Sequence, residues 1–277
     1  MKKRKLFTLL TAVTLVLSAC APGASPEETT APAATVSQTE MPTQPPTEPP
    51  TEPTTEPTTE PPTQGQPEIS REDFSFEGVF PAYRNGTCVP GIDVSSHQGE
   101  IDWQAVKAAG VEFVMIRVGF RGYGKTGSLN PDQMAQENYR QAKAAGLKIG
   151  AYFFSQALTP EEAVEEAGLA LELTKAWEME LPLAYDWEYI SEEARTAGMT
   201  AEEVTACAAA FCEAVRQGGR TPMVYASLGQ DWLLPEKLED IFLWTADLPA
   251  RAVLWQFSRE LEIPGISGPV DGNVWLP

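Results

Sequence analysis

The chain has 277 residues and a formal net charge of −19, because its 39 acidic residues outnumber its 20 basic residues. So acidic a chain is a poor partner for nucleic acid, since that binding depends on basic groups that neutralise phosphates. The single histidine also excludes a metal centre built from several histidines. We therefore expect no nucleic-acid partner and no histidine-based metal site.

Residues 1–20, MKKRKLFTLLTAVTLVLSAC, combine a basic start, an apolar run and small residues before Cys20. The apolar run is too short to span a bilayer comfortably and is typical of a secretory signal peptide. Its ending, Leu-Ser-Ala-Cys, is similar to that of bacterial lipoprotein signals, in which cleavage leaves the cysteine as a lipidated N-terminus. We predict an extracytoplasmic protein anchored in a bacterial membrane through Cys20 and facing the cell wall. An ordinary signal peptide with an incidental cysteine is the alternative.

Residues 21–75 form the expected linker. As far as about Ser70 they consist mainly of Pro, Thr and Glu, as in TEPPTEPTTEPTTEPP, with almost no large apolar residues. Such a segment cannot bury enough surface to offset its ordering entropy, so we expect a disordered tether. Residues 1–20 hold four basic residues and residues 21–70 hold eight acids, which leaves a net charge of −15 on the rest of the chain.

Residues 76–277 are expected to form one α/β domain, because strand-like runs alternate with helical patterns through most of its length. The sequence predicts eight strands, at 91–96, 113–119, 148–155, 181–188, 221–227, 241–247, 253–258 and 269–275. It predicts four helices between the first five of these strands, at 101–110, 131–146, 160–178 and 200–219.

Strands that alternate with helices indicate parallel neighbours with right-handed crossovers, and eight strands suggest closure as a barrel. The connections after residues 247 and 258 are too short for a crossover helix, so the last strands should be partly antiparallel. The predicted fold class is an irregular TIM-like (β/α) barrel whose C-terminal strands carry few helices. We expect a monomer.

The run LPLAYDWEYI, residues 181–190, resembles a buried strand, yet it contains Asp186 and Glu188. Residues two apart in a strand point to the same side, so both carboxyls should enter the same space. Asp93 lies in the first expected strand and Asp271 in the last, which closure brings side by side. Since functional groups of a barrel gather at the carboxyl ends of its strands, the four acids can converge on one site.

Carboxylates this close cannot all ionise at low cost, so at least one should have a raised pKa. A protonated acid beside an ionised one is what cleavage of a glycosidic bond requires. Three aromatic residues at strand ends, Tyr152, Tyr225 and Trp255, would suit stacking on sugar rings, although core packing is the alternative for each. Two other interpretations of the acid pair stay open at this point, a purely structural pair and a magnesium or calcium site.

Five segments together resemble the lysozymes of glycoside hydrolase family 25. They are GIDVSSHQGEIDW, FVMIRVGFR, AGLKIGAYFFSQA, LPLAYDWE, and WQFS followed by GISGPVDGNVW. The resemblance covers residues 91–277 and implies an irregular α/β barrel. It also implies hydrolysis of the β-1,4 bond between N-acetylmuramic acid and N-acetylglucosamine in peptidoglycan. We expect no metal and no cofactor.

By this resemblance Glu188 is the proton donor. Asp186 is its partner, which either stabilises the transition state directly or orients the substrate acetamido group. Asp93 and Asp271 match the other acids of the groove, Asp93 with a catalytic and Asp271 with a substrate-binding role. Tyr152 matches a site tyrosine, Trp255 and Gln256 match a pair beneath the floor, and His97 matches a scaffold histidine. We therefore expect Tyr152, Tyr225, Trp255 and Gln256 to bind substrate together with Asp271.

The sequence departs from the family pattern at Trp187, between the two acids, and strand alternation should point this side chain away from the site. Cys88, Cys207 and Cys212 leave two possibilities open. Either Cys88 forms a disulfide with one of the other two cysteines, or all three are free thiols.

Two alternative functions also stay open. One is a peptidoglycan-binding lipoprotein on the same fold without catalysis, and the other is a hydrolase of another glycan such as chitin.

Overall fold

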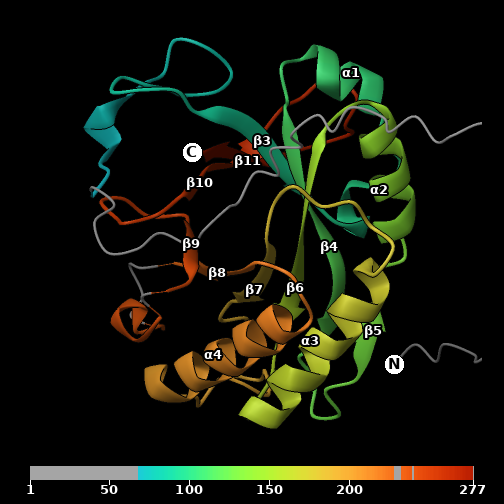
Figure 1. Ribbon diagram of the computed structural model, residues 1–277, viewed down its shortest axis with the longest axis vertical. Helices are drawn as coiled ribbons and strands as arrows, with labels where there is room; N and C mark the ends of the chain where they lie inside the picture. The colour runs from blue at the N-terminus through green and yellow to red at the C-terminus, as the bar shows by residue number, and fades with distance from the viewer. Residues whose placement is uncertain (1–67, 228–231, 239, 277) are drawn as a thin grey trace, which may run out of the picture. The chain divides into compact units, whose positions relative to one another are not determined.

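The computed structural model describes residues 68–227, 232–238 and 240–276 (Figure 1). The predicted signal peptide, Cys20 and the linker up to residue 67 lie outside the described residues. Within the described part of the chain, no helix is both long enough and apolar enough to cross a membrane.

Eight strands close into a barrel, in the order β3, β11, β10, β9, β8, β7, β6, β4, with β4 pairing back to β3. Their bounds are β3 Val89–Val94, β4 Phe113–Arg121, β6 Lys148–Ser155, β7 Leu183–Trp187, β8 Pro222–Ala226, β9 Phe242–Thr245, β10 Leu254–Leu261 and β11 Val270–Trp275. Each overlaps one of the eight predicted strands, so the predicted barrel is confirmed. A further short strand, β5 (Leu129–Pro131), pairs with the last residues of β4, beyond the part that pairs with β3, and was not predicted.

The strands from β3 through β4 and on to β10 are parallel to their neighbours, whereas β11 is antiparallel to both β10 and β3. The partly antiparallel C-terminal end is therefore confirmed. The prediction was less accurate for β9 and β10, which are parallel although only residues 246–253 join them. Because β9 has only four residues, a short connection without a helix can return the chain to the start of the next strand.

Four helices fill the crossovers, at α1 Trp103–Ala108, α2 Ala135–Ala144, α3 Pro160–Thr174 and α4 Ala201–Gln217, each within a predicted helix (Figure 1). Local sequence explains where three of them begin. The side chains of Asp102, Thr159 and Thr200 accept hydrogen bonds from backbone N–H groups in the first turn. Helix α4 has a complete capping box, because Glu203 also accepts from the Thr200 backbone N–H.

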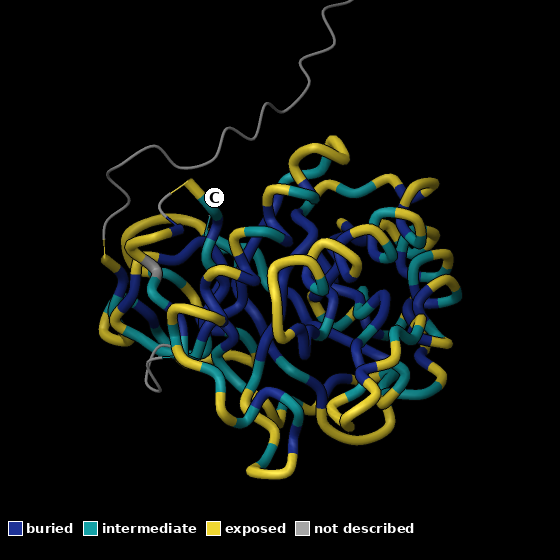
Figure 2. The backbone as a smooth tube through the Cα atoms, turned by 90° about the horizontal axis from the view of Figure 1, so that it is seen from below, coloured by how far each residue is buried: buried dark blue, intermediate teal, exposed yellow. Residues whose placement is uncertain are grey.

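The buried residues form two main layers. Figure 2 colours the buried segments of the backbone dark blue. The larger layer lies between the barrel and its helices, and includes Phe153, Tyr185 and Phe211. The smaller layer fills the barrel interior with aromatic and aliphatic side chains such as Phe113 and Trp244. Gly91 permits this filling, because a Cβ there would come within 2.3 Å of the Phe113 ring. The barrel is thus a packed core and not a pore, which leaves the strand ends for a site.

The chain before β3 is packed against the barrel. The Ile69 N–H donates to the Ala250 carbonyl at 2.9 Å, and the Phe74 ring lies 4.7 Å from that of Trp255. Phe74 also begins a small hairpin of β1 (Phe74–Ser75) and β2 (Ala82–Tyr83). Residues 69–75, which the sequence analysis assigned to the linker, therefore pack with the folded domain, because Ile69 and Phe74 supply apolar side chains to it.

Candidate active site

A cavity of about 520 Å³ opens at the carboxyl ends of the parallel strands. Seven of the eight side chains predicted for catalysis or substrate binding line it. They are Asp93, Tyr152, Asp186, Glu188, Tyr225, Gln256 and Asp271. The eighth, Trp255, lies elsewhere.

Asp186 and Glu188 enter the cavity from one face at the end of β7, as the two-residue spacing predicted. Asp186 is buried and lies in register between Phe154 of β6 and Tyr225 of β8, whereas Glu188 follows the strand and is only partly buried. Trp187, between them, points away from the cavity into the layer beneath the helices, where its ring lies 5.6 Å from that of Trp232. Its departure from the family pattern therefore changes packing rather than the site.

Asp93 and Asp271 lie opposite each other on β3 and β11, because closure of the barrel pairs these strands. The side-chain amide of Gln256 joins them: its Nε2 donates to Asp93 Oδ2 at 3.1 Å and to Asp271 Oδ2 at 3.3 Å. Asn273 Nδ2 donates to the same Asp93 oxygen at 2.8 Å, and Trp244 Nε1 holds Asn273 through a 2.9 Å hydrogen bond to its Oδ1. The floor of the cavity is thus a hydrogen-bonded network with two acids at its centre.

All four acids have raised pKa values, mainly because burial removes them from water. Burial raises the pKa of Asp93 and of Asp186 well above the usual range, and the charges of Asp271 and Glu188, respectively, add to the shift. Burial raises the pKa of Asp271 to about 6. Burial also raises the pKa of Glu188, against the opposing effect of the Arg259 charge. Such a set can keep a proton near neutral pH, which is what acid catalysis needs.

Arg117 is a site residue that the sequence analysis missed. It lines the cavity from β4, its Nε and Nη2 both lie 2.9 Å from Asp132 Oδ2, and its Nη2 donates to Ser96 Oγ at 3.2 Å. Its positive charge opposes the rise in the pKa of Asp186. An arginine inside the otherwise apolar run FVMIRVGF was the available signal, but its partner Asp132 lies in a loop that strand periodicity does not locate.

Arg259 and Tyr225 form a second unpredicted arrangement. Arg259 Nη2 donates to Tyr225 Oη at 3.0 Å, and Tyr225 Oη donates to Gln256 Oε1 at 3.0 Å. Gln256 in turn donates to Asp93 and Asp271. The hydrogen bonds therefore all point in one direction, from the exposed Arg259 to the two acids of the floor. Tyr225 therefore orients the floor of the cavity in addition to lining it.

Trp255 does not line the cavity. It is buried on the other side of β10, against Phe74 and Phe257. Successive residues of a strand point to opposite faces, so Gln256 and Trp255 cannot both face the site. The predicted contact between Trp255 and substrate is thereby corrected: this side chain holds the N-terminal segment onto the barrel.

Three other predictions concern His97, metal binding and the cysteines. His97 lies exposed at the rim in the short 3₁₀ helix η2 (Ser96–Gln98). Among residues 68–227, 232–238 and 240–276, no three side chains of His, Cys, Asp or Glu are grouped as a metal site. Cys88, Cys207 and Cys212 are free thiols, so the alternative of a bridge from Cys88 is not realised in this structure.

The family model of glycosyl hydrolases family 25 matches residues 92–266, which is more than half of the chain. The chain therefore belongs to this family. The matched segment includes Asp93, Asp186, Glu188 and Gln256, and it ends shortly before Asp271.

Curated relatives and solved structures agree with this family. An autolytic lysozyme of Clostridium acetobutylicum is 30% identical over 195 residues, which cover 65% of this chain and 54% of the relative. Lysozyme M1 of Streptomyces globisporus is 38% identical over 78 residues, 28% of this chain and 24% of the relative. The modular autolysin LytC of Streptococcus pneumoniae, solved at 1.6 Å, superposes with a TM-score of 0.58 at 25% identity, covering 69% of this chain and 47% of that one. The chain thus spans about half the length or less of these relatives.

Proposed function

We propose that the protein is a peptidoglycan muramidase, a lysozyme that hydrolyses the β-1,4 bond between N-acetylmuramic acid and N-acetylglucosamine. The observation that carries the proposal is the presentation of Asp186 and Glu188 from one face of β7 into an open cavity, opposite Asp93 and Asp271. The names of its relatives support it, since they include lysozymes and an autolysin. LytC has also been solved in complex with a synthetic peptidoglycan ligand, at 25% identity to this chain.

In this proposal Glu188 protonates the oxygen of the leaving sugar. It is the less buried acid of the pair, so it lies nearer the mouth of the cavity, where the leaving sugar departs. Burial raises its pKa, which keeps a proton available for transfer.

Asp186 faces the sugar that develops positive charge. It is buried and lines the cavity, and its enclosed Oδ1 has no hydrogen-bond partner among the described residues, so no protein donor neutralises the carboxyl from that side. Positive charge on the sugar, together with Arg117 nearby, favours ionised Asp186 and leaves the proton on Glu188. Asp186 then either stabilises the charged transition state directly or orients the acetamido group of the substrate.

The remaining site residues bind and orient. Asp93 and Asp271 are held together by Gln256, so they supply a fixed polar floor for the sugar hydroxyls. Tyr152 and Tyr225 offer aromatic surface at the cavity wall and pack against Trp244 beneath. Asp93 also takes part in catalysis, because its charge raises the pKa of Asp186, whereas the other residues bind substrate.

We also propose that the protein acts outside the cytoplasm as a monomer on glycan strands. In this arrangement residues 1–20 are a lipoprotein signal, the segment after Cys20 is a tether, and lipidated Cys20 holds the enzyme at the membrane. The barrel carries a strong negative charge, so general attraction to an anionic membrane surface would not replace such an anchor.

The test is digestion of purified peptidoglycan by the full-length chain beside its Glu188→Gln variant, with new reducing ends identified by mass spectrometry. We expect muramic acid ends with the wild type and at least a hundredfold fewer with Glu188→Gln. Glu192→Gln is the matched control, because Glu192 is exposed in the same loop and should cut normally. Equal cutting by Glu188→Gln would overturn the assignment. Binding without cutting by both proteins would favour the peptidoglycan-binding lipoprotein.

A further inference from the structure

Sheet pairing stops just before the proposed proton donor. The last register pair between β6 and β7 joins Ser155 to Trp187, so Glu188 is the first residue beyond the strand. Its backbone carbonyl instead accepts a hydrogen bond from Gln156 Nε2, at 3.1 Å. Gln156 is the corresponding first residue after β6. The Gln156 side chain therefore supplies one hydrogen bond to the backbone of Glu188, where the hydrogen bonds between β6 and β7 have ended.

The amide of Gln156 uses its hydrogen-bonding groups on both sides. Its Nε2 also donates to the Ser155 carbonyl at 2.9 Å, and its Oε1 accepts from Thr196 Oγ1 at 2.7 Å. Both N–H groups and one oxygen acceptor are thus occupied, and the side chain is fully buried. The Thr196 hydroxyl comes from the loop that follows Glu188, so Gln156 ties the start of that loop to its later part.

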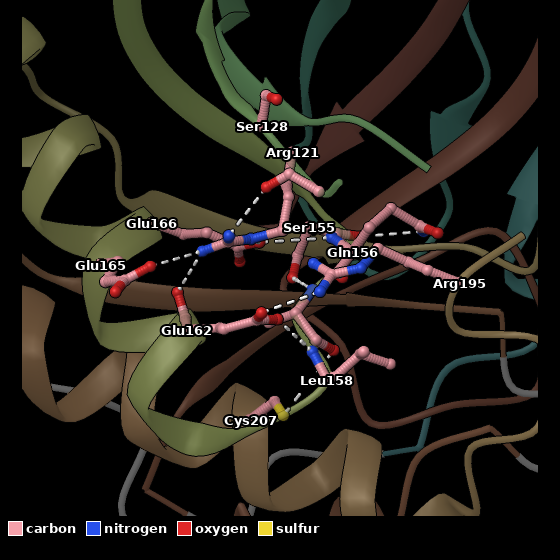
Figure 3. A network of polar contacts seen from close by, with 12 residues as sticks. Arg121, Ser128, Ser155, Gln156, Leu158, Glu162, Glu165, Glu166, Arg195 and Cys207 are labelled. Atoms are coloured by element: carbon pink, nitrogen blue, oxygen red, sulfur yellow. Dashed lines mark hydrogen bonds and ion pairs between the residues drawn. The ribbon is translucent and has the colours of Figure 1, made fainter. Parts of the chain in front are cut away.

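Gln156 is itself held by a buried charge network, shown in Figure 3. Its backbone N–H donates to Glu166 Oε1 at 3.3 Å, and its carbonyl accepts from Arg195 Nη1 at 3.2 Å. Glu166 pairs with Arg121 at 2.7 Å, with both side chains buried, and Arg195 pairs with Glu162 at 2.8 Å. Because these partners come from β4, α3 and the loop after β7, Gln156 cannot shift without disturbing several elements.

This network does not bind substrate. Gln156 is fully buried and is not among the side chains that line the cavity, whereas Glu188 is. Simple satisfaction of a buried carbonyl would explain one hydrogen bond. It does not explain why charged side chains hold the backbone of Gln156 on both sides while Thr196 orients its amide, directly behind the carboxyl that must point at the leaving oxygen.

We infer that Gln156 is a positioning residue, which fixes the backbone of Glu188 and thereby aims its carboxyl. This inference rests on the proposed function, in which Glu188 is the proton donor. Proton transfer requires hydrogen-bond reach between donor and acceptor, so a shift of about 1 Å in Glu188 should cost on the order of a hundredfold in rate. Substrate binding by the cavity floor should not change.

The test uses Gln156→Met in the full-length chain, which keeps the side-chain length and removes the donors. We expect kcat on solubilised glycan strands to fall by about 10- to 100-fold, with KM within about twofold of wild type. Thr174→Val is the matched control. The Thr174 hydroxyl is equally buried and donates to the Ala170 carbonyl at 2.8 Å, away from the site, so its loss should lower Tm but leave kcat unchanged.

The outcomes separate this inference from the proposed function. If Glu188→Gln retains wild-type activity, the assignment of Glu188 as the proton donor fails, and the positioning role fails with it. If Glu188→Gln is inactive while folded Gln156→Met has wild-type kcat and a lowered Tm, the function stands and the positioning role is overturned. Should Gln156→Met not fold, Thr196→Val takes its place, because it removes only the bond that orients the amide. We expect a smaller fall in kcat there, about threefold to tenfold, and a wild-type kcat would overturn the inference.

Discussion

Asp93 and Asp271 lie directly opposite each other on two antiparallel strands, and one amide nitrogen, Gln256 Nε2, donates to a carboxyl oxygen of each. The backbone ladder prevents the two residues from moving apart, so their repulsion is relieved by protonation and by the shared donor. The same arrangement that gives the cavity its chemistry therefore weakens the fold whenever both groups ionise.

The protein should be more stable at mildly acidic than at neutral pH. Burial raises the pKa of Asp271 to about 6 from its ordinary value of 3.8, and the pKa of Asp93 and Asp186 also rises. Between the unfolded and folded values the native state binds more protons, so its stability falls as pH rises through about 6. After allowance for solvent screening, Asp271 alone should account for about 1–2 kcal/mol.

Thermal unfolding of wild type and Asp271→Asn from pH 4 to pH 8 measures this effect. We expect the Tm of wild type to fall across that range and the Tm of Asp271→Asn to fall less. Asp240→Asn is a suitable control, because it removes a carboxyl that does not line the cavity. A Tm of wild type that rises steadily up to pH 8 would contradict the direction of the shifts.

Arg259→Gln should move the alkaline limb of the activity profile to higher pH. The Arg259 charge opposes the rise in the pKa of Glu188. Its removal lets that pKa rise further, so Glu188 stays protonated up to a higher pH. The measurement is the pH dependence of kcat/KM on solubilised glycan. Arg251→Gln, which removes an exposed arginine elsewhere on the barrel, serves as the control. An alkaline limb at unchanged or lower pH in Arg259→Gln would show that Arg259 does not influence the donor.

Much of the fold could be predicted from the sequence because its signals are local. The helix starting at Ala201 follows a threonine cap with an acid three residues on, and the core strands are continuous apolar runs between helical patterns. The short strand β5, Leu129–Pro131, has no such pattern, since three residues carry no period. Likewise, the parallel pairing of β9 and β10 depends on how short β9 is, which periodicity does not define.

Strand alternation could predict which side chains of a strand face the cavity, and the site was predictable to that extent. The two-residue spacing of Asp186 and Glu188 correctly placed both in the cavity, and the same rule explains why Gln256 faces it and Trp255 does not. Applied to that pair, alternation alone could have excluded Trp255. Arg117 was missed for a different reason, because its partner Asp132 is fifteen residues away in a loop and only the folded chain brings them together.

Fatty acid should be attached to Cys20. Growth of a bacterial host that makes the full-length chain with labelled palmitate should yield a labelled, membrane-bound protein, and Cys20→Ala should abolish both label and membrane association. Cys88→Ala is the control, since Cys88 is a free, partly buried thiol of the folded domain. An unlabelled wild type would exclude the anchor, and labelling that persists in Cys20→Ala would place the lipid elsewhere.

Trp255→Ala should cost stability and leave the chemistry intact. Its ring is buried between Phe74 of the N-terminal segment and Phe257. Truncation therefore opens a cavity and weakens the packing of the β1–β2 hairpin, which begins at Phe74. We expect a loss of about 3–5 kcal/mol in the free energy of unfolding, as is usual for a buried tryptophan. Below the lowered Tm, kcat and KM should stay within about twofold of wild type, because the ring does not reach the cavity. Phe76→Ala, on the exposed edge of the same aromatic cluster, should cost much less stability. A large rise in KM with normal stability would instead mean that Trp255 contacts the glycan, as the sequence had suggested.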